Sequence, residues 1–114
     1  MSDRTVTLFT ESNFSDVEHF AGVSIIRFQA PWCAPCSSSE GFFDLAISQM
    51  PETIITGKVN VIQAPVLASK YGVWGLPNTL IFRNGQVVDR ISGPQPAAVF
   101  LKAVQKAMEN IASD

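Results

Sequence analysis

Cysteine and histidine are scarce in this sequence, which has two cysteines and one histidine among 114 residues. A structural zinc site usually needs four nitrogen or sulfur ligands, so zinc is a minor alternative here. Two cysteines also cannot build the disulfide scaffold of a small secreted protein. Because Cys33 and Cys36 are only three positions apart, redox chemistry is the favoured interpretation.

An excess of charge of one sign is also missing. Eight Lys and Arg and ten Asp and Glu give a net charge of −2, and the basic residues are scattered along the chain. A nucleic-acid partner needs a basic patch and is therefore not expected. The 46% of hydrophobic and 16% of charged residues are typical of a folded chain and not of a disordered one.

The sequence has no long apolar run, and residues 1–5 carry charges of both signs. Neither a signal peptide nor a transmembrane segment is expected, so we interpret the chain as a cytoplasmic protein without a membrane partner. Repeats and linkers are absent as well, and 114 residues suit one core. We expect one domain over residues 1–114, acting as a monomer.

Hydrophobic periodicity predicts an α/β order. The expected strands are 5–9, 23–30, 54–62, 79–83 and 86–91, and the expected helices are 11–20, 34–50, 66–71 and 96–111. Asn84-Gly85 fits a two-residue hairpin turn, and Gly72 suits a left-handed helix cap. Ser15-Asp16-Val17-Glu18 has the form of a capping box, which leaves the start of the first helix open. This order implies parallel strands joined by crossovers, an antiparallel edge and helices on both faces.

Several single residues are predicted to have structural roles only. Gly57 weakens the third predicted strand. The phenylalanines at core spacing are Phe42, Phe43 and Phe100. His19 is expected at the surface, far from the cysteines, and Asp44 and Glu109 on solvated helix faces.

The cysteine pair follows the strongest strand signal and lies where a helix is expected to begin. Cysteines three apart at a helix start face the same way, so their sulfurs can bond to each other or exchange with a substrate disulfide. At the helix N-terminus, unpaired N–H groups and the dipole should lower the pKa of Cys33 below the free value of about 8.5. Pro35 fits the first turn, which does not need its missing N–H. Two cysteines that merely share a core are the alternative.

The predicted mechanism follows from these positions. Cys33, at the exposed helix end, attacks a substrate disulfide, and Cys36, one turn deeper, resolves the mixed disulfide.

Trp32-Cys33-Ala34-Pro35-Cys36 resembles the W-C-G-P-C signature of the thioredoxin family, with Ala in place of Gly. The segment 71–77 is similar to the one that leads to the family's cis-proline, which makes Pro77 the candidate. Phe82, Asn84-Gly85 and Gly93 also match. The resemblance runs over nearly the whole chain and implies the thioredoxin fold, a mixed sheet of about five strands flanked by about four helices.

This resemblance implies a protein-disulfide oxidoreductase that acts on disulfide-containing proteins. No cofactor would be bound, because the Cys33–Cys36 disulfide is itself the redox group. A reductase of the thioredoxin-reductase kind, using NADPH, would regenerate the dithiol. A thioredoxin-fold chaperone or assembly module with non-essential cysteines is the alternative, and an oxidant or isomerase in an oxidising compartment is a third possibility. Retention of both cysteines favours the oxidoreductase.

The resemblance also implies a groove around Cys33 that holds an extended substrate segment. Its residues would be Trp32, Trp74, Gly75, Leu76, Pro77 and Gly93. Trp74 stands where the family often has a polar or charged residue, so we expect a more apolar groove. Packing of Trp74 into the core beside Tyr71 is the alternative.

The main departure from the family is Arg27, six residues before Cys33, where thioredoxins carry a buried acid. Lys58 matches the family's lysine near that acid, and would face a second cation unless a carboxylate such as Glu40 joins the two. If Arg27 points beneath the active site, we expect it to lower the pKa of Cys36, favour the dithiol and make the protein less reducing. An Arg27 that snorkels outward would have no such effect.

Two smaller differences from the family pattern lie near the cysteine pair. Gln29 replaces an aromatic residue, so weaker support of the active-site loop is expected. Ser37-Ser38-Ser39 and Gly41 replace a basic residue and a proline, which predicts a more mobile first helical turn.

Overall fold

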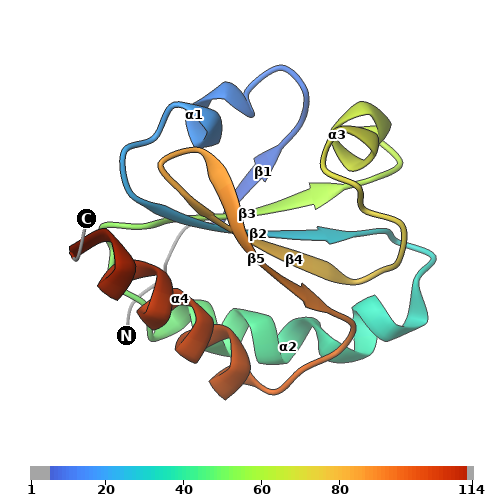
Figure 1. Ribbon diagram of the computed structural model, residues 1–114. Helices are drawn as coiled ribbons and strands as arrows, with labels where there is room; N and C mark the ends of the chain where they lie inside the picture. Colours follow the sequence, from blue (N-terminus) through green and yellow to red (C-terminus); the bar gives the residue numbers. More distant parts are fainter. Residues whose placement is uncertain (1–5, 113–114) are drawn as a thin grey trace.

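The structure is a computed structural model that describes residues 6–112. Its five strands form one sheet in the order β1-β3-β2-β4-β5, in which β1, β3 and β2 are parallel and β4 and β5 antiparallel to their neighbours (Figure 1). The strands are β1 (Thr7–Phe9), β2 (Val23–Gln29), β3 (Ile55–Asn60), β4 (Asn78–Arg83) and β5 (Gln86–Ser92). The helices are α1 (Ser15–Glu18), α2 (Ala34–Ser48), α3 (Pro65–Lys70) and α4 (Ala97–Ala112). The mixed α/β architecture is therefore confirmed.

Helices cover both faces of the sheet, with α2 and α4 on one side and α1 and α3 on the other (Figure 1). Successive residues of β2 alternate between the two layers, as a strand requires. Ile25 packs in the core beneath α2 and α4, whereas Ile26 and Phe28 pack beneath α1 and α3. Because helices cover both sides of the sheet, six of the seven β2 residues are buried. Gln29, at the end of β2, is the only residue of this strand that is partly exposed.

The hairpin and the turn predictions are confirmed. Asn84 and Gly85 have φ angles of 52° and 81° and connect β4 to β5, with Arg83 paired to Gln86. Gly72 follows α3 with a φ of 65°. The Leu76–Pro77 peptide bond is cis, as the resemblance implied.

The start of α1, which the sequence left open, does not use the capping-box pattern. The residue that caps α1 is Phe14, which already has helical angles (φ −69°, ψ −15°) and makes no side-chain cap bond. The chain turns earlier, because the Thr10 N–H donates to Asn13 Oδ1 at 2.7 Å. An N-cap needs an extended backbone, so Ser15 cannot serve as one within this turn. The strand predicted at 5–9 begins at Thr7 in β1, and residue 5 lies outside the described residues.

Gly57 lies inside β3 and lets β1 approach this strand closely. A Cβ atom at Gly57 would overlap the ring of Phe9 and lie 3.0 Å from the Thr7 carbonyl oxygen. Phe9 is buried in the core on the α1 and α3 side. The glycine therefore makes room for a core side chain from the edge strand.

One core prediction on α2 is also wrong. Phe43 is fully buried and Phe42 is 51% exposed. Adjacent residues on a helix point about 100° apart, and the buried stripe of α2 includes Phe43 but not Phe42. Within residues 6–112, the structure contains no helix long and apolar enough to cross a membrane.

Candidate active site around the cysteine pair

Cys33 and Cys36 form a disulfide at the start of α2, with their Cα atoms 5.2 Å apart. Cys33 is the N-cap residue, with an extended backbone (φ −89°, ψ 108°), and Pro35 lies in the first turn. The Cys36 N–H donates to Cys33 Sγ at 3.2 Å. One sulfur thus occupies the position of an N-cap acceptor, at the positive end of a 15-residue helix.

The disulfide is more covered than expected. Cys33 is 6% exposed and Cys36 3%, so the prediction of an exposed Cys33 is wrong for the disulfide form. Ala30, Val61 and Leu76 pack around the two sulfurs in a small apolar cluster. Only a small part of Cys33 is therefore open to a substrate in the disulfide form.

The residues predicted for the groove lie on three loops near this cluster. Trp32 is 69% exposed and Trp74 84% exposed, so packing of Trp74 into the core is excluded. Leu76 contacts the cluster, and the next residue, Pro77, is buried. The Gly93 N–H donates to the Pro77 carbonyl at 2.8 Å, which ties the turn after β5 to the cis-proline.

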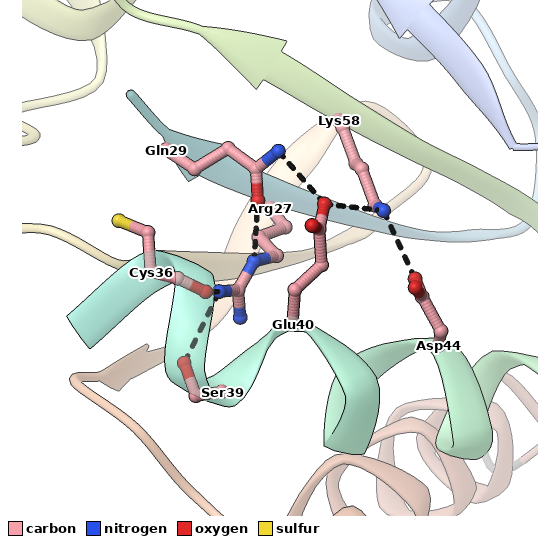
Figure 2. A network of polar contacts seen from close by, with 7 residues as sticks. All are labelled: Arg27, Gln29, Cys36, Ser39, Glu40, Asp44 and Lys58. Carbon is pink, nitrogen blue, oxygen red and sulfur yellow. Dashed lines mark hydrogen bonds and ion pairs between the residues drawn. The ribbon is translucent and has the colours of Figure 1, made fainter. Parts of the chain in front are cut away.

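Arg27 lies beneath the first turn of α2 and is completely buried (Figure 2). Its Nε donates to Gln29 Oε1 at 2.7 Å, and its Nη2 donates to the Cys36 carbonyl at 2.9 Å and to Ser39 Oγ at 3.2 Å. The guanidinium also lies 5.5 Å from the centre of the Phe43 ring. The outward orientation, which was the alternative for Arg27, is therefore wrong.

Lys58 neighbours Arg27 on β3 and binds two carboxylates of α2 (Figure 2). Its Nζ lies 2.7 Å from Glu40 Oε2 and 2.9 Å from Asp44 Oδ1. Gln29 Nε2 donates to the same Glu40 oxygen at 3.0 Å. Glu40 thus forms an ion pair with Lys58 and is connected to Arg27 by the hydrogen bonds of Gln29. Asp44, predicted on a purely solvated face, is half exposed and contributes an ion pair.

This network shifts two pKa values. Burial lowers the pKa of Arg27, because the charged form loses its water, and Glu40 and Asp44 oppose this effect. Arginine nevertheless keeps its proton in proteins. Hydrogen bonds from Lys58 and Gln29 hold the pKa of Glu40 below its ordinary value. Both groups are therefore charged at neutral pH.

Comparison with known proteins agrees with this geometry. The sequence profile of the family described as Thioredoxin matches residues 5–106, which is most of the chain. The chain belongs to the thioredoxin family. It is 33% identical over 86 residues to the thioredoxin of Griffithsia pacifica, covering 75% of this chain and 79% of that one. It is also 33% identical over 82 residues to the chloroplastic M-type thioredoxin of Pisum sativum, covering 72% of this chain and 48% of that protein.

Solved structures show the same fold. The thioredoxin of Malassezia sympodialis superposes with a TM-score of 0.81 at 27% identity, over 94% of this chain and 96% of that chain. A mutant thioredoxin of Halobacterium salinarum superposes with a TM-score of 0.80 at 25% identity, over 90% of this chain and 89% of that chain. With the thioredoxin fold and a disulfide in the signature motif, this thioredoxin-family protein is a thiol–disulfide oxidoreductase.

Two members of the network around Arg27 and Lys58 were missed from the sequence. Ser39 is buried, donates to the Pro35 carbonyl at 2.6 Å and accepts from Arg27. Asp44 shares Lys58 with Glu40. Helical spacing could have found both, because Ser39 lies three residues after Cys36, and Asp44 four after Glu40.

Gln29 does more than the sequence suggested. It accepts from Arg27 and donates to Glu40, so it links the buried cation to the α2 carboxylate (Figure 2). The greater mobility expected of the first α2 turn stays a prediction. A small pocket of about 160 Å³ opens beside Cys36, and its walls include Gln29, Glu40 and Asn60.

Metal ligands do not gather at this site. Over residues 6–112, the structure has no group of three His, Cys, Asp or Glu side chains placed to hold a metal ion. His19, the single histidine, is exposed on the loop after α1.

Proposed function

We propose that this protein reduces disulfides in other proteins, with Cys33 as the attacking thiolate and Cys36 as the resolving group. The observation that carries the proposal is the hydrogen bond from the Cys36 N–H to Cys33 Sγ at the N-cap of α2. A sulfur that accepts an N–H bond at a helix N-terminus is stabilised as an anion. The thiolate is the nucleophile in disulfide exchange.

The reaction proceeds by two displacements. The Cys33 thiolate attacks one sulfur of the substrate disulfide, which forms a mixed disulfide and releases the other substrate sulfur as a thiolate. Cys36 then releases its proton to water and attacks Cys33 Sγ as a thiolate, which forms the Cys33–Cys36 disulfide and releases the second substrate thiolate. Both substrate thiolates take protons from water. Two electrons pass from the dithiol to the substrate.

The substrate segment lies in a groove formed by Trp32, by the loop that ends at cis-Pro77, and by the turn that contains Gly93. The exposure of Trp32 and of Trp74 supports this role, as does the bond between Gly93 and Pro77. Large exposed aromatic side chains are frequent at recognition surfaces. Gly75 leaves the loop open to the partner, since no atom lies within 4 Å of the position where its Cβ would be.

Other residues support the pair. Pro35 stiffens the first turn of α2, and Lys58 holds Glu40 against the sheet. The chain acts as a single domain and as a monomer, without a bound cofactor. A reductase that draws electrons from NADPH regenerates the dithiol, and a reducing compartment, the cytoplasm, is the proposed location. Cell fractionation would test the location, because the pea relative is named as chloroplastic.

The test is a trap for the mixed disulfide. In a Cys36→Ser variant the resolving sulfur is absent, so Cys33 should stay covalently bound to substrate proteins and release them on reduction. A Cys33→Ser variant is the matched control and should capture none. If neither variant accumulates a mixed disulfide, and the wild type does not reduce insulin-type disulfides, the chaperone alternative is favoured.

A further inference from the structure

Among residues 6–112, no carboxylate contacts the charged group of Arg27. Its hydrogen-bond acceptors are the Gln29 amide, the Cys36 carbonyl and the Ser39 hydroxyl, all of them neutral. Its Nη1 atom is buried and has no partner within the described residues. The nearby Phe43 ring is neutral as well. A buried cation without a counter-ion is costly, because neutral acceptors replace only part of the lost hydration.

The two carboxylates of the network compensate this charge only in part. Both Glu40 and Asp44 bind Lys58, and Glu40 reaches Arg27 only through Gln29. Their side chains are 37% and 51% exposed, so solvent screens their fields, whereas Arg27 is fully buried. The uncompensated positive charge therefore lies where Arg27 is bonded, at the backbone of Cys36.

Reduction of the disulfide creates an anion in the turn of α2 that Arg27 binds. When two molecules of glutathione reduce the Cys33–Cys36 bond, the S–S bond breaks, two electrons enter the pair and glutathione disulfide forms. One of the two new thiols can ionise by releasing its proton to water. The disulfide form is neutral at the same position and offers Arg27 no negative charge.

We propose that Arg27 sets the redox equilibrium of the pair, because its buried positive charge favours the reduced form, which carries a thiolate in the turn that Arg27 binds, over the neutral disulfide form. This inference rests on the proposed function of Cys33 and Cys36. Arg27 is a positioning and electrostatic residue and does not touch the substrate. Its charge stabilises the dithiol form over the disulfide form, so the protein is a weaker reductant than the same fold without this cation.

The test compares redox equilibria of full-length variants in glutathione buffers, with free thiols counted by alkylation and mass spectrometry. An Arg27→Met variant should shift the equilibrium constant about tenfold toward the disulfide, which is about 30 mV for a two-electron couple. Arg27→Lys keeps the charge and should stay within about threefold of the wild type. Arg83→Met is the matched control, because Arg83 lies at the hairpin end of β4, paired with Val23. It should leave the equilibrium unchanged.

A Glu40→Gln variant distinguishes an effect of charge on the redox equilibrium from an effect of altered packing. It also keeps the inference testable if Arg27→Met does not fold. It loosens the same network but removes a negative charge, so it should shift the equilibrium toward the dithiol, opposite to Arg27→Met. A purely structural role would give both variants the same sign. No shift in either variant, or a shift of both in one direction, would overturn the inference. A wild type that does not exchange with glutathione at all would overturn the proposed function as well.

Discussion

Arg27 and Lys58 are direct neighbours in the parallel register of β2 and β3, and both side chains point toward α2. Two cations on one face of a sheet repel each other unless anions separate them. Helix α2 reduces this repulsion, because its Glu40 and Asp44 form ion pairs with Lys58. Arg27 instead donates hydrogen bonds to two neutral oxygens of α2, the Cys36 carbonyl and the Ser39 hydroxyl. The same arrangement fastens the first turn of α2, which carries Cys36, to the sheet.

The first prediction concerns the pH dependence of stability. The pKa of Glu40 is lowered in the folded protein, so its contribution to stability is complete above the unfolded value of about 4.3. This contribution is lost as the pH falls through the folded pKa. We expect Glu40→Gln to lower the free energy of unfolding by about 1 kcal/mol at pH 7, because the site is partly open to solvent.

Urea unfolding at pH 7 and at pH 3 measures this effect. The difference in the free energy of unfolding between wild type and Glu40→Gln should be smaller at pH 3 than at pH 7. Glu109→Gln is the matched control on an exposed helix face and should show no gap at either pH. If Glu40→Gln lowers the free energy of unfolding by the same amount at both pH values, the charge of Glu40 does not contribute to stability.

The second prediction concerns the contact between β1 and β3. A Gly57→Ala substitution places a methyl group against the Phe9 ring and the Thr7 carbonyl. Phe9 is buried, so it cannot move aside without a void. We expect the free energy of unfolding to fall by about 1–3 kcal/mol, measured by urea titration. Unchanged stability would mean that Phe9 has another place to pack.

The third prediction concerns Gly41, an exposed residue inside α2. Its missing Cβ would meet no atom within 4 Å, so Gly41→Ala should stabilise the protein by about 0.5–1 kcal/mol. Hydrogen exchange should show weak protection of the amides at 37–39 in the wild type and stronger protection in the variant. Strong protection already in the wild type would refute the predicted mobility of the first turn.

The orientation of Arg27 could be predicted from the sequence only in part. The alternation of β2 places Arg27 on the face of Ile25, opposite to Ile26 and Phe28. The sequence could not settle whether that face is covered at the position of Arg27, because coverage depends on where α2 crosses the sheet. Only the packed structure shows that Cys36 and Ser39 close it.

Other differences have the same physical cause. The elements, the hairpin and the cis-proline could be predicted, because local spacing and family motifs determine them. The face of α2 that meets the sheet could not, since Phe42 and Phe43 satisfy the same periodicity. The start of α1 depends on a turn held by the Asn13 side chain, which the capping-box pattern does not contain.

The fourth prediction concerns the recognition of substrates. Trp74 is 84% exposed, so Trp74→Ala should change the free energy of unfolding by less than about 0.5 kcal/mol. If Trp74 binds the substrate segment, kcat/KM for a protein disulfide should fall about tenfold, as expected for an anchoring aromatic residue. A small aromatic disulfide that does not fill the groove should react at an unchanged rate.

A second variant controls for the loss of exposed apolar surface. Val88→Thr removes an exposed apolar side chain from β5 and should leave both rates unchanged. Equal losses for the protein and the small disulfide would point instead to a disturbed Cys33.

The most direct test of disulfide reduction by the Cys33–Cys36 pair is the reduction of insulin disulfides with dithiothreitol as the electron source. The wild type should accelerate the reaction well above the rate with dithiothreitol alone, and Cys33→Ser and Cys36→Ser should both fall to that background. A wild-type rate equal to the background, or a Cys33→Ser variant as active as the wild type, would contradict the role of the pair.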